Sequence, residues 1–232
     1  MDYIGIIGAM PEEVAQLIEQ MEEKEMTEIA GMKFYDGKLW GKKAVVVKSG
    51  IGKVNMAACT QILAGTYKVE ALINTGVAGG LYAPINIGDI VLSKDTLQHD
   101  MDATGFGYEP GVIPQMGQST FYGDQYLIKK AKESCEEVNP DISVYVGRVV
   151  SGDQFISSDE KKKYLVEQFD GYCAEMEGAA MAQVAYLNDI PFVIIRAISD
   201  KADHSASMNY NDFEEQAIVH TIRLLRAMFA KI

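Results

Sequence analysis

The stretch AEMEGAAMAQVAYLNDIPFVIIRAISD, residues 174–200, decides the fold prediction because it holds a helix, a break and a buried strand in succession. Its first half predicts a helix with an apolar stripe made of Met176, Ala180, Val184 and Leu187. Asp189-Ile190-Pro191 ends this helix, since proline cannot continue it. Residues 192–198, FVIIRAI, are mostly apolar and rich in β-branched side chains, which predicts a strand buried on both faces.

Carboxylates flank this helix-strand unit on both sides. Glu175 and Glu177 lie just before or at the helix start, and Asp200 follows the strand by two residues. Ligands of open α/β sheets bind outside the carboxyl ends of the strands, so Asp200 is expected in a ligand crevice. Alternatively, Asp200 caps a turn and the glutamates begin a helix, where acidic residues are favoured. Arg196 favours the first interpretation, because a guanidinium in an apolar strand needs an anionic partner and these same carboxylates are the nearest candidates. Among all carboxylates, we expect Glu13 or Glu177 to make the contact.

Composition and charge exclude several classes of function. The chain has 232 residues, which suits a single domain over residues 1–232, and its net charge of −12 argues against a nucleic-acid partner. Cys59, Cys135 and Cys173 are far apart and odd in number, so we expect reduced thiols in a cytoplasmic protein. The three histidines are dispersed, which predicts no metal site. No apolar run approaches the length of a membrane span, so we expect no membrane association.

Strands and helices alternate along the chain. The predicted strands cover residues 3–8, 32–40, 44–48, 71–74, 90–93, 144–150 and 192–198. Predicted helices follow Pro11 (with the apolar face Val14, Leu17, Ile18 and Met21), Lys53, Asp124 and Tyr210. This alternation predicts an α/β fold: a three-layer αβα sandwich with a mostly parallel central sheet.

Four strand ends carry loops of small, acidic or aromatic residues that one crevice could gather: Gly8–Glu13, Thr75–Gly80, Ser151–Ile156 and Ser199–Asp203. The first of them is not a dinucleotide site, because it lacks G-x-G-x-x-G and its carboxylates would repel a pyrophosphate. The helix start favours the ionised form of Glu12 or Glu13, which suits a group that orients water. Residues Gln98–Met116 lack periodicity and form a long loop, a kind of segment that is often functional.

Six motifs occur in an order that resembles a known family: GIIGAMPEE (5–13), KSGIGKV (48–54), INTG (73–76), VSGD (150–153), EME (175–177) and RAISD (196–200). Over essentially its whole length the chain is similar to the bacterial 5′-methylthioadenosine/S-adenosylhomocysteine nucleosidases. These enzymes belong to the purine nucleoside phosphorylase–uridine phosphorylase superfamily. The resemblance implies a nucleoside phosphorylase-like fold, hydrolysis of an adenine–ribose bond, and no cofactor.

The resemblance also implies roles for individual residues. Asp200 protonates N7 of the leaving adenine with help from Ser199, and Glu13 orients the attacking water with Arg196 close by. Glu177 accepts hydrogen bonds from the ribose hydroxyls. The resemblance also implies that Met176 packs on the sugar, that Phe155 stacks on adenine, and that backbone groups near Ile156 contact the edge of the base. The residues implied around the sugar and the 5′-alkylthio group are Met10, Ile51, Val77, Tyr210, Phe106 and Tyr108. In this family a loop from the second subunit of a homodimer completes the pocket, which gives the Gln98–Met116 loop a purpose.

The physical demands of the reaction agree with these roles. An N-ribosyl bond breaks through an oxocarbenium-like state, so the base needs a proton donor and the sugar needs nearby anions. Donation by Asp200 at neutral pH requires a raised pKa, which burial could supply.

Two departures from the family pattern bear on specificity. Val77 stands where better-known members have a serine beside the reaction centre, and Gly178-Ala179-Ala180 replaces a more common Ala-Thr-Ala. Either could shift substrate preference, and aminodeoxyfutalosine is an additional candidate substrate.

Two competing functions remain open from the sequence. A nucleoside phosphorylase on the same fold would need cationic groups for phosphate, whereas the first strand's exit is acidic. A non-catalytic nucleoside sensor would need the pocket but no paired acid and base, and the presence of both Glu13 and Asp200 argues against it.

Overall fold

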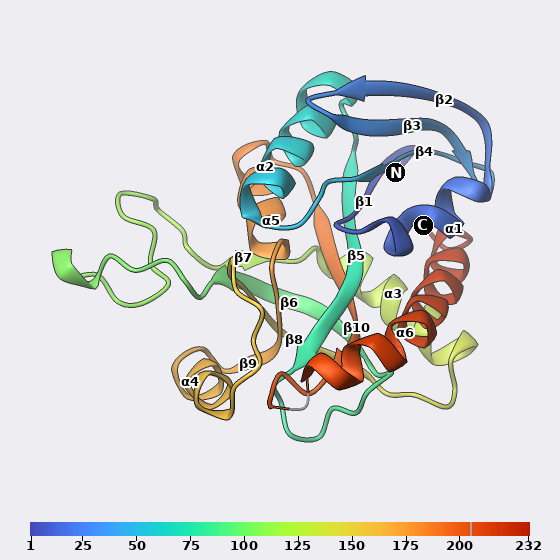
Figure 1. Ribbon diagram of the computed structural model, residues 1–232. Coiled ribbons are helices and arrows are strands. Elements are labelled where there is room, and N and C mark those ends of the chain that lie inside the picture. Colours follow the sequence, from blue (N-terminus) through green and yellow to red (C-terminus); the bar gives the residue numbers. More distant parts are fainter. Residues whose placement is uncertain (205) are drawn as a thin grey trace.

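The computed structural model describes residues 1–204 and 206–232, including all their side chains except those of residues 207–216. Figure 1 shows the elements along the chain. The helices are α1 (Pro11–Glu19), α2 (Lys53–Ile62) with a π-helical turn (Leu63–Tyr67), a 3₁₀ turn (Thr104–Phe106), α3 (Gln125–Val138), α4 (Asp159–Phe169), α5 (Gly178–Leu187) and α6 (Ala206–Phe229). The strands are β1 (Tyr3–Gly8), β2 (Met21–Ile29), β3 (Met32–Leu39), β4 (Lys42–Lys48), β5 (Ala71–Gly80), β6 (Ile90–Gln98), β7 (Phe121–Tyr122), β8 (Val144–Ser151), β9 (Gly171–Glu175) and β10 (Phe192–Asp200).

A parallel group of strands forms the centre of the sheet. β1 pairs in parallel with β4 and β5, β5 pairs in parallel with β10, and β6–β8–β9 form a second parallel run. Antiparallel pairs join β2–β3–β4 at one edge, link β10 to β6, and bring β9 to the end of β5. The predicted α/β fold is therefore confirmed, with antiparallel additions around its parallel centre.

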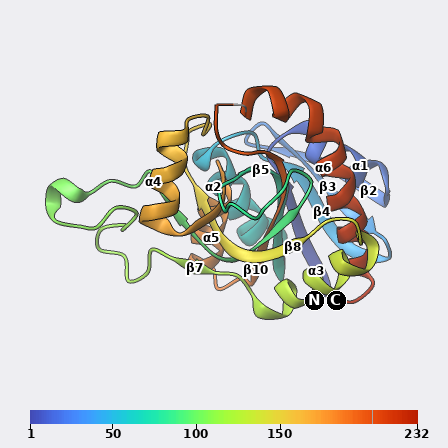
Figure 2. The same cartoon turned by 90° about the horizontal axis from the view of Figure 1, so that it is seen from below.

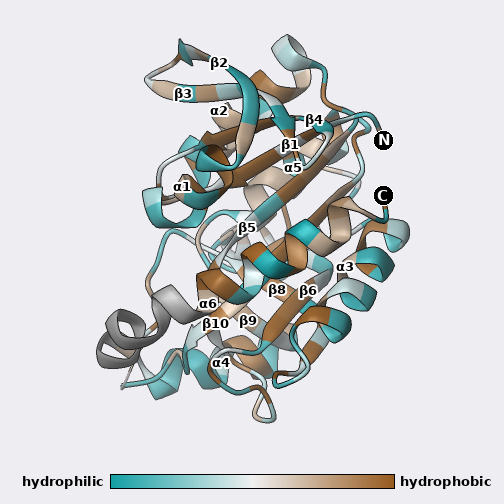
Figure 3. Cartoon of the chain, turned by 90° about the vertical axis from the view of Figure 1, so that its right-hand side faces the viewer, coloured by the Kyte–Doolittle hydropathy of each residue, from teal (hydrophilic) through white to brown (hydrophobic). Residues whose placement is uncertain are grey.

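Helices cover both faces of this sheet, and the pleat of each strand explains why. Along β1, Ile4 and Ile6 pack into the core beneath α1, α3 and α6, whereas Ile7 packs into the core beneath α2 and α5. Successive side chains of a strand point to opposite faces, so a strand covered on both sides must be apolar throughout. Figures 2 and 3 show the helices on either side of the sheet and the hydrophobic colouring of its inner strands. No helix within the described ranges is long and apolar enough to cross a bilayer.

Strand β10 confirms its predicted position, but the stripe predicted for the helix before it is wrong. Met176 lies ahead of α5, and Leu187 is 63% exposed. The buried residues of α5 are instead Gly178, Ala179, Ala180, Met181, Ala182 and Ala185. Because α5 packs against both α2 and the sheet, small residues on several sides of the helix replace a single stripe.

Residues Thr75–Gly80 were predicted as a loop but continue β5 as a strand. The small residues of this segment make room for neighbouring side chains and do not form a turn. A Cβ added at Gly76 would lie 2.4 Å from Glu13 Oε1 and 2.6 Å from Arg196 Nη1. A Cβ at Gly79 would lie 2.9 Å from Asp200 Oδ1. Glycine therefore lets functional side chains press against this strand.

Four strands and helices were not predicted: β2, β7, α4 and β9. Strand β2 reads MEEKEMTEI and lies at the sheet edge with mostly exposed side chains, so it lacks the apolar signal of an inner strand. Met21, predicted on a helix face, is the buried first residue of this strand. Helix α4 begins after Ser158, whose hydroxyl accepts a hydrogen bond from Lys161 N at 3.2 Å.

Candidate active site

A cavity of about 420 Å³ opens where the carboxyl ends of β1, β5, β9 and β10 meet. All four predicted strand-end loops contribute to it, as the crevice argument requires. Its lining consists of Ala9, Met10, Glu13, Ile51, Val77, Ala78, Gly79, Phe155, Ala174, Glu175, Met176, Glu177, Ser199 and Asp200. Its walls are mostly apolar, and its charged side chains are all carboxylates.

Glu13 lies buried in the first turn of α1. Its Oε2 accepts hydrogen bonds from the backbone N–H groups of Ala9 (2.5 Å) and Met10 (3.0 Å), and its Oε1 accepts one from Val77 (3.2 Å). Burial raises the pKa of Glu13 above its ordinary value, although Arg196 and these N–H groups act in the opposite direction. For Glu13, desolvation therefore outweighs the local effect of the helix start, which alone favours the anion.

Asp200 ends β10 and is also buried. Its Oδ2 accepts a hydrogen bond from the Ser199 hydroxyl at 2.9 Å, and its Oδ1 accepts one from Ala202 N at 2.7 Å. Burial raises the pKa of Asp200, against the lowering effect of both donors. The direction of this shift is the one that an acid role requires, and its cause is burial.

Arg196 and Glu175 form a buried ion pair behind the cavity, each side chain 2% exposed. Arg196 Nη2 donates to Glu175 Oε2 and to Asn74 Oδ1. Arg196 thus has the carboxylate partner that its burial demanded. The predicted partners, Glu13 and Glu177, are wrong as direct contacts, although both carboxylates act to raise the pKa of Arg196.

Glu175 joins this ion pair to the start of α5. Besides Arg196, its carboxylate accepts hydrogen bonds from the Ser151 hydroxyl and from the backbone N–H groups of Glu177 (3.1 Å) and Gly178 (2.7 Å). Ser151 Oγ in turn accepts one from Ala179 N at 2.7 Å. A single carboxylate therefore sets where the chain turns from β9 into α5.

Glu177 projects from that turn into the cavity. Its Oε1 accepts a hydrogen bond from Gly52 N at 2.8 Å. Burial, reinforced by the neighbouring Glu175 charge and opposed by Arg196, raises the pKa of Glu177 to about 7. Its charge therefore changes near neutral pH.

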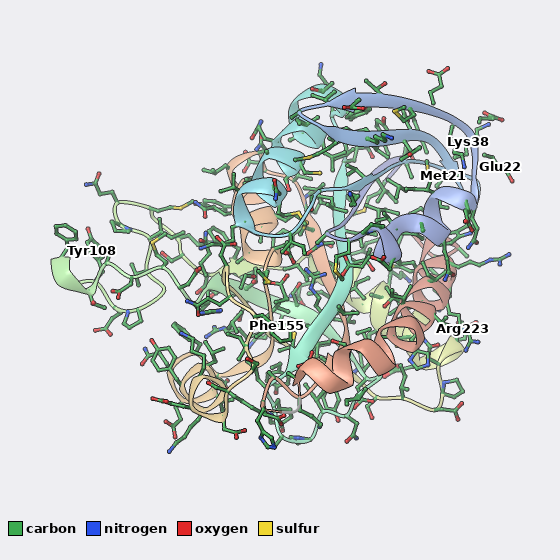
Figure 4. All side chains as sticks on the ribbon, viewed as in Figure 1. Met21, Glu22, Lys38, Tyr108, Phe155 and Arg223 are labelled. Carbon is green, nitrogen blue, oxygen red and sulfur yellow. The ribbon has the colours of Figure 1, made fainter. Side chains whose placement is uncertain are left out.

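The apolar side chains predicted around the substrate mostly line the cavity. Met10, Ile51, Val77 and Met176 are among its walls, and Phe155 stands at the rim, 53% exposed. Figure 4 labels Phe155 near the middle of the molecule.

Other predicted site residues do not line the cavity with their side chains. The Ile156 side chain is buried in a small cluster with Leu165 and Phe169, and the contact predicted for this residue is through its backbone. Phe106 and Tyr108 belong to the loop of residues 98–116, and Figure 4 labels Tyr108 where this loop projects from the body. Phe106 is 87% exposed, and neither residue lines the cavity of its own chain. The Tyr210 side chain lies outside the described residues.

Sequence reasoning missed the buried support of the site. Glu175 is among the carboxylates that flank the helix-strand unit and are candidate partners of Arg196, but the sequence assigns no role to Asn74 or Ser151. The signal that could have found them is polarity at positions where a strand ends inside a buried sheet. Among the described residues, no group of three or more His, Cys, Asp or Glu side chains is placed to hold a metal ion.

Comparison with known families places the chain clearly. A model of the phosphorylase superfamily matches residues 3–230. A 5′-methylthioadenosine/S-adenosylhomocysteine nucleosidase from Exiguobacterium sp. is 40% identical over 230 residues, covering 99% of this chain and 98% of the relative.

Solved structures agree with the sequence match. The Neisseria meningitidis 5′-methylthioadenosine/S-adenosylhomocysteine nucleosidase in complex with methylthio-immucillin-A superposes with a TM-score of 0.95 at 36% identity, covering 100% of both chains. A mutant of Helicobacter pylori futalosine hydrolase superposes with a TM-score of 0.94 at 32% identity, again covering 100% of both chains.

Proposed function

The chain belongs to the phosphorylase superfamily, and from this membership we propose that it is a hydrolase of adenine nucleosides, a 5′-methylthioadenosine/S-adenosylhomocysteine nucleosidase. It cleaves the N-glycosidic bond of both nucleosides and releases adenine and the 5-thioribose product. The observation that carries this function is a single apolar cavity holding two buried carboxyl groups, Glu13 and Asp200, each with a raised pKa. The names of the relatives support the nucleoside class.

The two carboxyl groups take complementary parts in the reaction. Asp200 gives its proton to N7 of adenine as the bond between C1′ and N9 breaks, so adenine leaves as a neutral molecule. Water adds to C1′, and Glu13 accepts the proton that this water loses. Glu177 and Glu175 keep negative charge near the cationic sugar, which favours an oxocarbenium-like transition state.

The walls of the cavity fit the two ends of the substrate. Phe155 stacks on adenine at the rim, and Met176 packs on the sugar. Met10 and Ile51 supply apolar surface for the 5′-alkylthio group. Val77 adds apolar surface near Glu13, while its backbone N–H holds that carboxylate at 3.2 Å.

Water rather than phosphate is the nucleophile in this proposal. Among the described residues that line the cavity, none is lysine or arginine and four are Glu or Asp. A phosphate dianion there would meet carboxylates without a cationic partner on the cavity surface. We expect methylthioadenosine to release adenine at the same rate in phosphate-free buffer and at millimolar phosphate. A strict requirement for phosphate in an assay of free adenine would assign the chain to the phosphorylases instead.

The similarity to futalosine hydrolase favours one alternative substrate. The same acid and base would serve an adenine nucleoside with a different 5′ substituent, such as aminodeoxyfutalosine. Competition between that nucleoside and methylthioadenosine, measured by adenine release, ranks the two substrates.

Glu177 should contribute to both binding and turnover, because it accepts the ribose hydroxyl hydrogen bonds and lies near the developing cation. We expect Glu177→Ala to raise KM and lower kcat by about tenfold each, since hydrogen bonds to charged groups contribute about 1.5–3 kcal/mol. In the wild type, KM should rise as pH falls through about 7, where Glu177 gains a proton and loses its acceptor charge. Steady-state kinetics from pH 6 to 8 test this. An unchanged KM in Glu177→Ala would remove the ribose assignment.

We infer a homodimer in which the Gln98–Met116 loop reaches the partner's pocket. Its support is Phe106, which is 87% exposed on a loop that projects from the body. Exposed aromatic side chains of this kind are typical of interfaces. We expect twice the chain mass in light scattering at micromolar concentration; a fully active monomer would contradict the dimer. The buried, unpaired cysteines fit a cytoplasmic enzyme.

A further inference from the structure

Lys53, Asp100 and Asp153 close a ring of hydrogen bonds outside the cavity. Lys53 Nζ donates to Asp100 Oδ1 at 2.6 Å, Asp153 N donates to Asp100 Oδ2 at 2.9 Å, and Lys53 N donates to Asp153 Oδ1 at 2.8 Å. Both oxygens of Asp100 are thus occupied. The side chains of Lys53 and Asp100 are only 18% and 16% exposed, so water weakens this ion pair less than it would a surface pair.

The ring joins three segments that are far apart in the sequence. Lys53 begins α2 directly after the loop that holds Ile51 in the cavity wall and Gly52 against Glu177. Asp153 precedes Phe155 at the cavity rim. Asp100 lies at the root of the projecting loop, where Lys53 Nζ also donates to Gln98 Oε1 at 3.0 Å.

The sheet already joins two of these segments, because Gln98 pairs with Ser151 in the parallel β6–β8 ladder and His99 N donates to Ser151 O at 2.9 Å. The ring adds the link from both of them to the start of α2. Gly52 has a φ of 95° and caps α2 without a side chain, and a Cβ there would lie 3.1 Å from Asp153 Oδ1. A Cβ at Gly152 would lie 2.4 Å from Nε2 of buried His99. The two glycines let the segments approach, and the ring adds polar contacts between the start of α2 and the other two segments.

We propose that the ring of Lys53, Asp100 and Asp153 is a positioning device for the nucleoside pocket. The ring fixes the distance between Ile51 and Phe155, which contact opposite ends of the substrate. It also links the projecting loop to the segments that carry these two residues. The proposal rests on the proposed nucleosidase function. Its chemistry is positioning alone, since none of the three side chains lines the cavity.

Kinetics of ring variants test the proposal. Lys53→Met keeps the aliphatic stem and the backbone N–H but removes the ammonium, and Asp100→Asn leaves an amide that cannot accept both donors. We expect each to raise KM for methylthioadenosine, and the inhibition constant of adenine, about tenfold, with kcat within about threefold of the wild type. The double variant should show no more than the larger single effect, because both changes break one contact. Lys53→Arg should restore most of the affinity.

Lys38→Met is the matched control, since it removes the same charge from an exposed ion pair with Glu23 on the β2–β3 edge, well away from Phe155 in Figure 4. Amide hydrogen exchange of residues 50–56 and 152–156 provides a readout that does not need turnover. We expect faster exchange there in both ring variants and no change in the control.

Two results would overturn the proposal: unchanged KM in Lys53→Met and Asp100→Asn, even with a lowered Tm, or unchanged exchange in both segments. A wild type that releases no adenine would instead refute the nucleosidase function, and the exchange measurement would still decide whether the ring holds the segments.

Discussion

Asp200→Asn is expected to lower kcat for methylthioadenosine by about 10²- to 10⁴-fold, the usual contribution of a positioned acid. Asparagine keeps the shape of the side chain but has no proton to transfer to N7. Its Oδ1 can still accept from Ala202 N, and its amide can face Ser199 Oγ, which then donates to Ala78 O, 3.5 Å away. The variant should therefore fold and bind adenine nearly as well as the wild type.

The pH dependence separates an acid role from a structural one. The acid form of Asp200 is the active form, so wild-type kcat should fall as pH rises through its raised pKa. Asp200→Asn should lack this decline. Asp159→Asn, which removes a carboxylate that is 69% exposed on α4, is the control and should retain wild-type kinetics. Near-normal turnover by Asp200→Asn would remove Asp200 from its role.

Stability should respond to Asp200 in a definite direction. A carboxyl whose pKa is raised in the folded state stabilises the fold below its unfolded pKa, and this contribution is lost as pH rises through the folded pKa. At a pH above the folded pKa, Asp200→Asn should thus be at least as stable as the wild type. A large loss of Tm there would show that the carboxylate is needed for packing.

The sequence was sufficient for the features that follow from strong local patterns. The apolar run that became β10 is short and rich in β-branched residues, which favours a strand buried on both faces, and its exit places Asp200 at the crevice. The family motifs supplied the remaining site residues. The prediction ended strand β5 too early because Gly76 and Gly79 have weak strand propensity. Pairing with residues 195–200 of β10, which the sequence does not reveal, continues the strand to Gly80.

The partner of Arg196 was beyond the reach of sequence reasoning for a similar reason. The burial cost of the guanidinium predicts a carboxylate but not which one, because three glutamates come close to it in the fold. Register decides: β8 and β9 pair Ser151 with Glu175, and this holds Glu175 beside Arg196. The raised pKa of Glu13 was likewise hidden, since local helix electrostatics can be read from the sequence but desolvation cannot.

Glu175→Gln is expected to lower the free energy of unfolding by about 3–5 kcal/mol, as removal of one partner from a buried ion pair commonly does. The variant leaves the Arg196 guanidinium buried with Asn74 but without a direct ionic partner. It also weakens the hydrogen bonds from Glu177 N and Gly178 N that fix the turn into α5. Activity should fall as well, because that turn positions Glu177. Chemical denaturation and adenine release measure the two effects.

The double variant Glu175→Gln/Arg196→Met distinguishes an unpaired charge from lost packing. Removing the guanidinium as well eliminates the uncompensated charge, so the double variant should be more stable than Glu175→Gln alone. Activity should stay low in both, since neither restores the electrostatics of the site. The negative charge of Glu175 also raises the pKa of Glu177. In Glu175→Gln this pKa should fall, so the pH below which KM rises should move below about 7. A double variant that is less stable than Glu175→Gln would show that the pair acts mainly through packing, and an unmoved KM profile would show that Glu175 does not set the charge of Glu177.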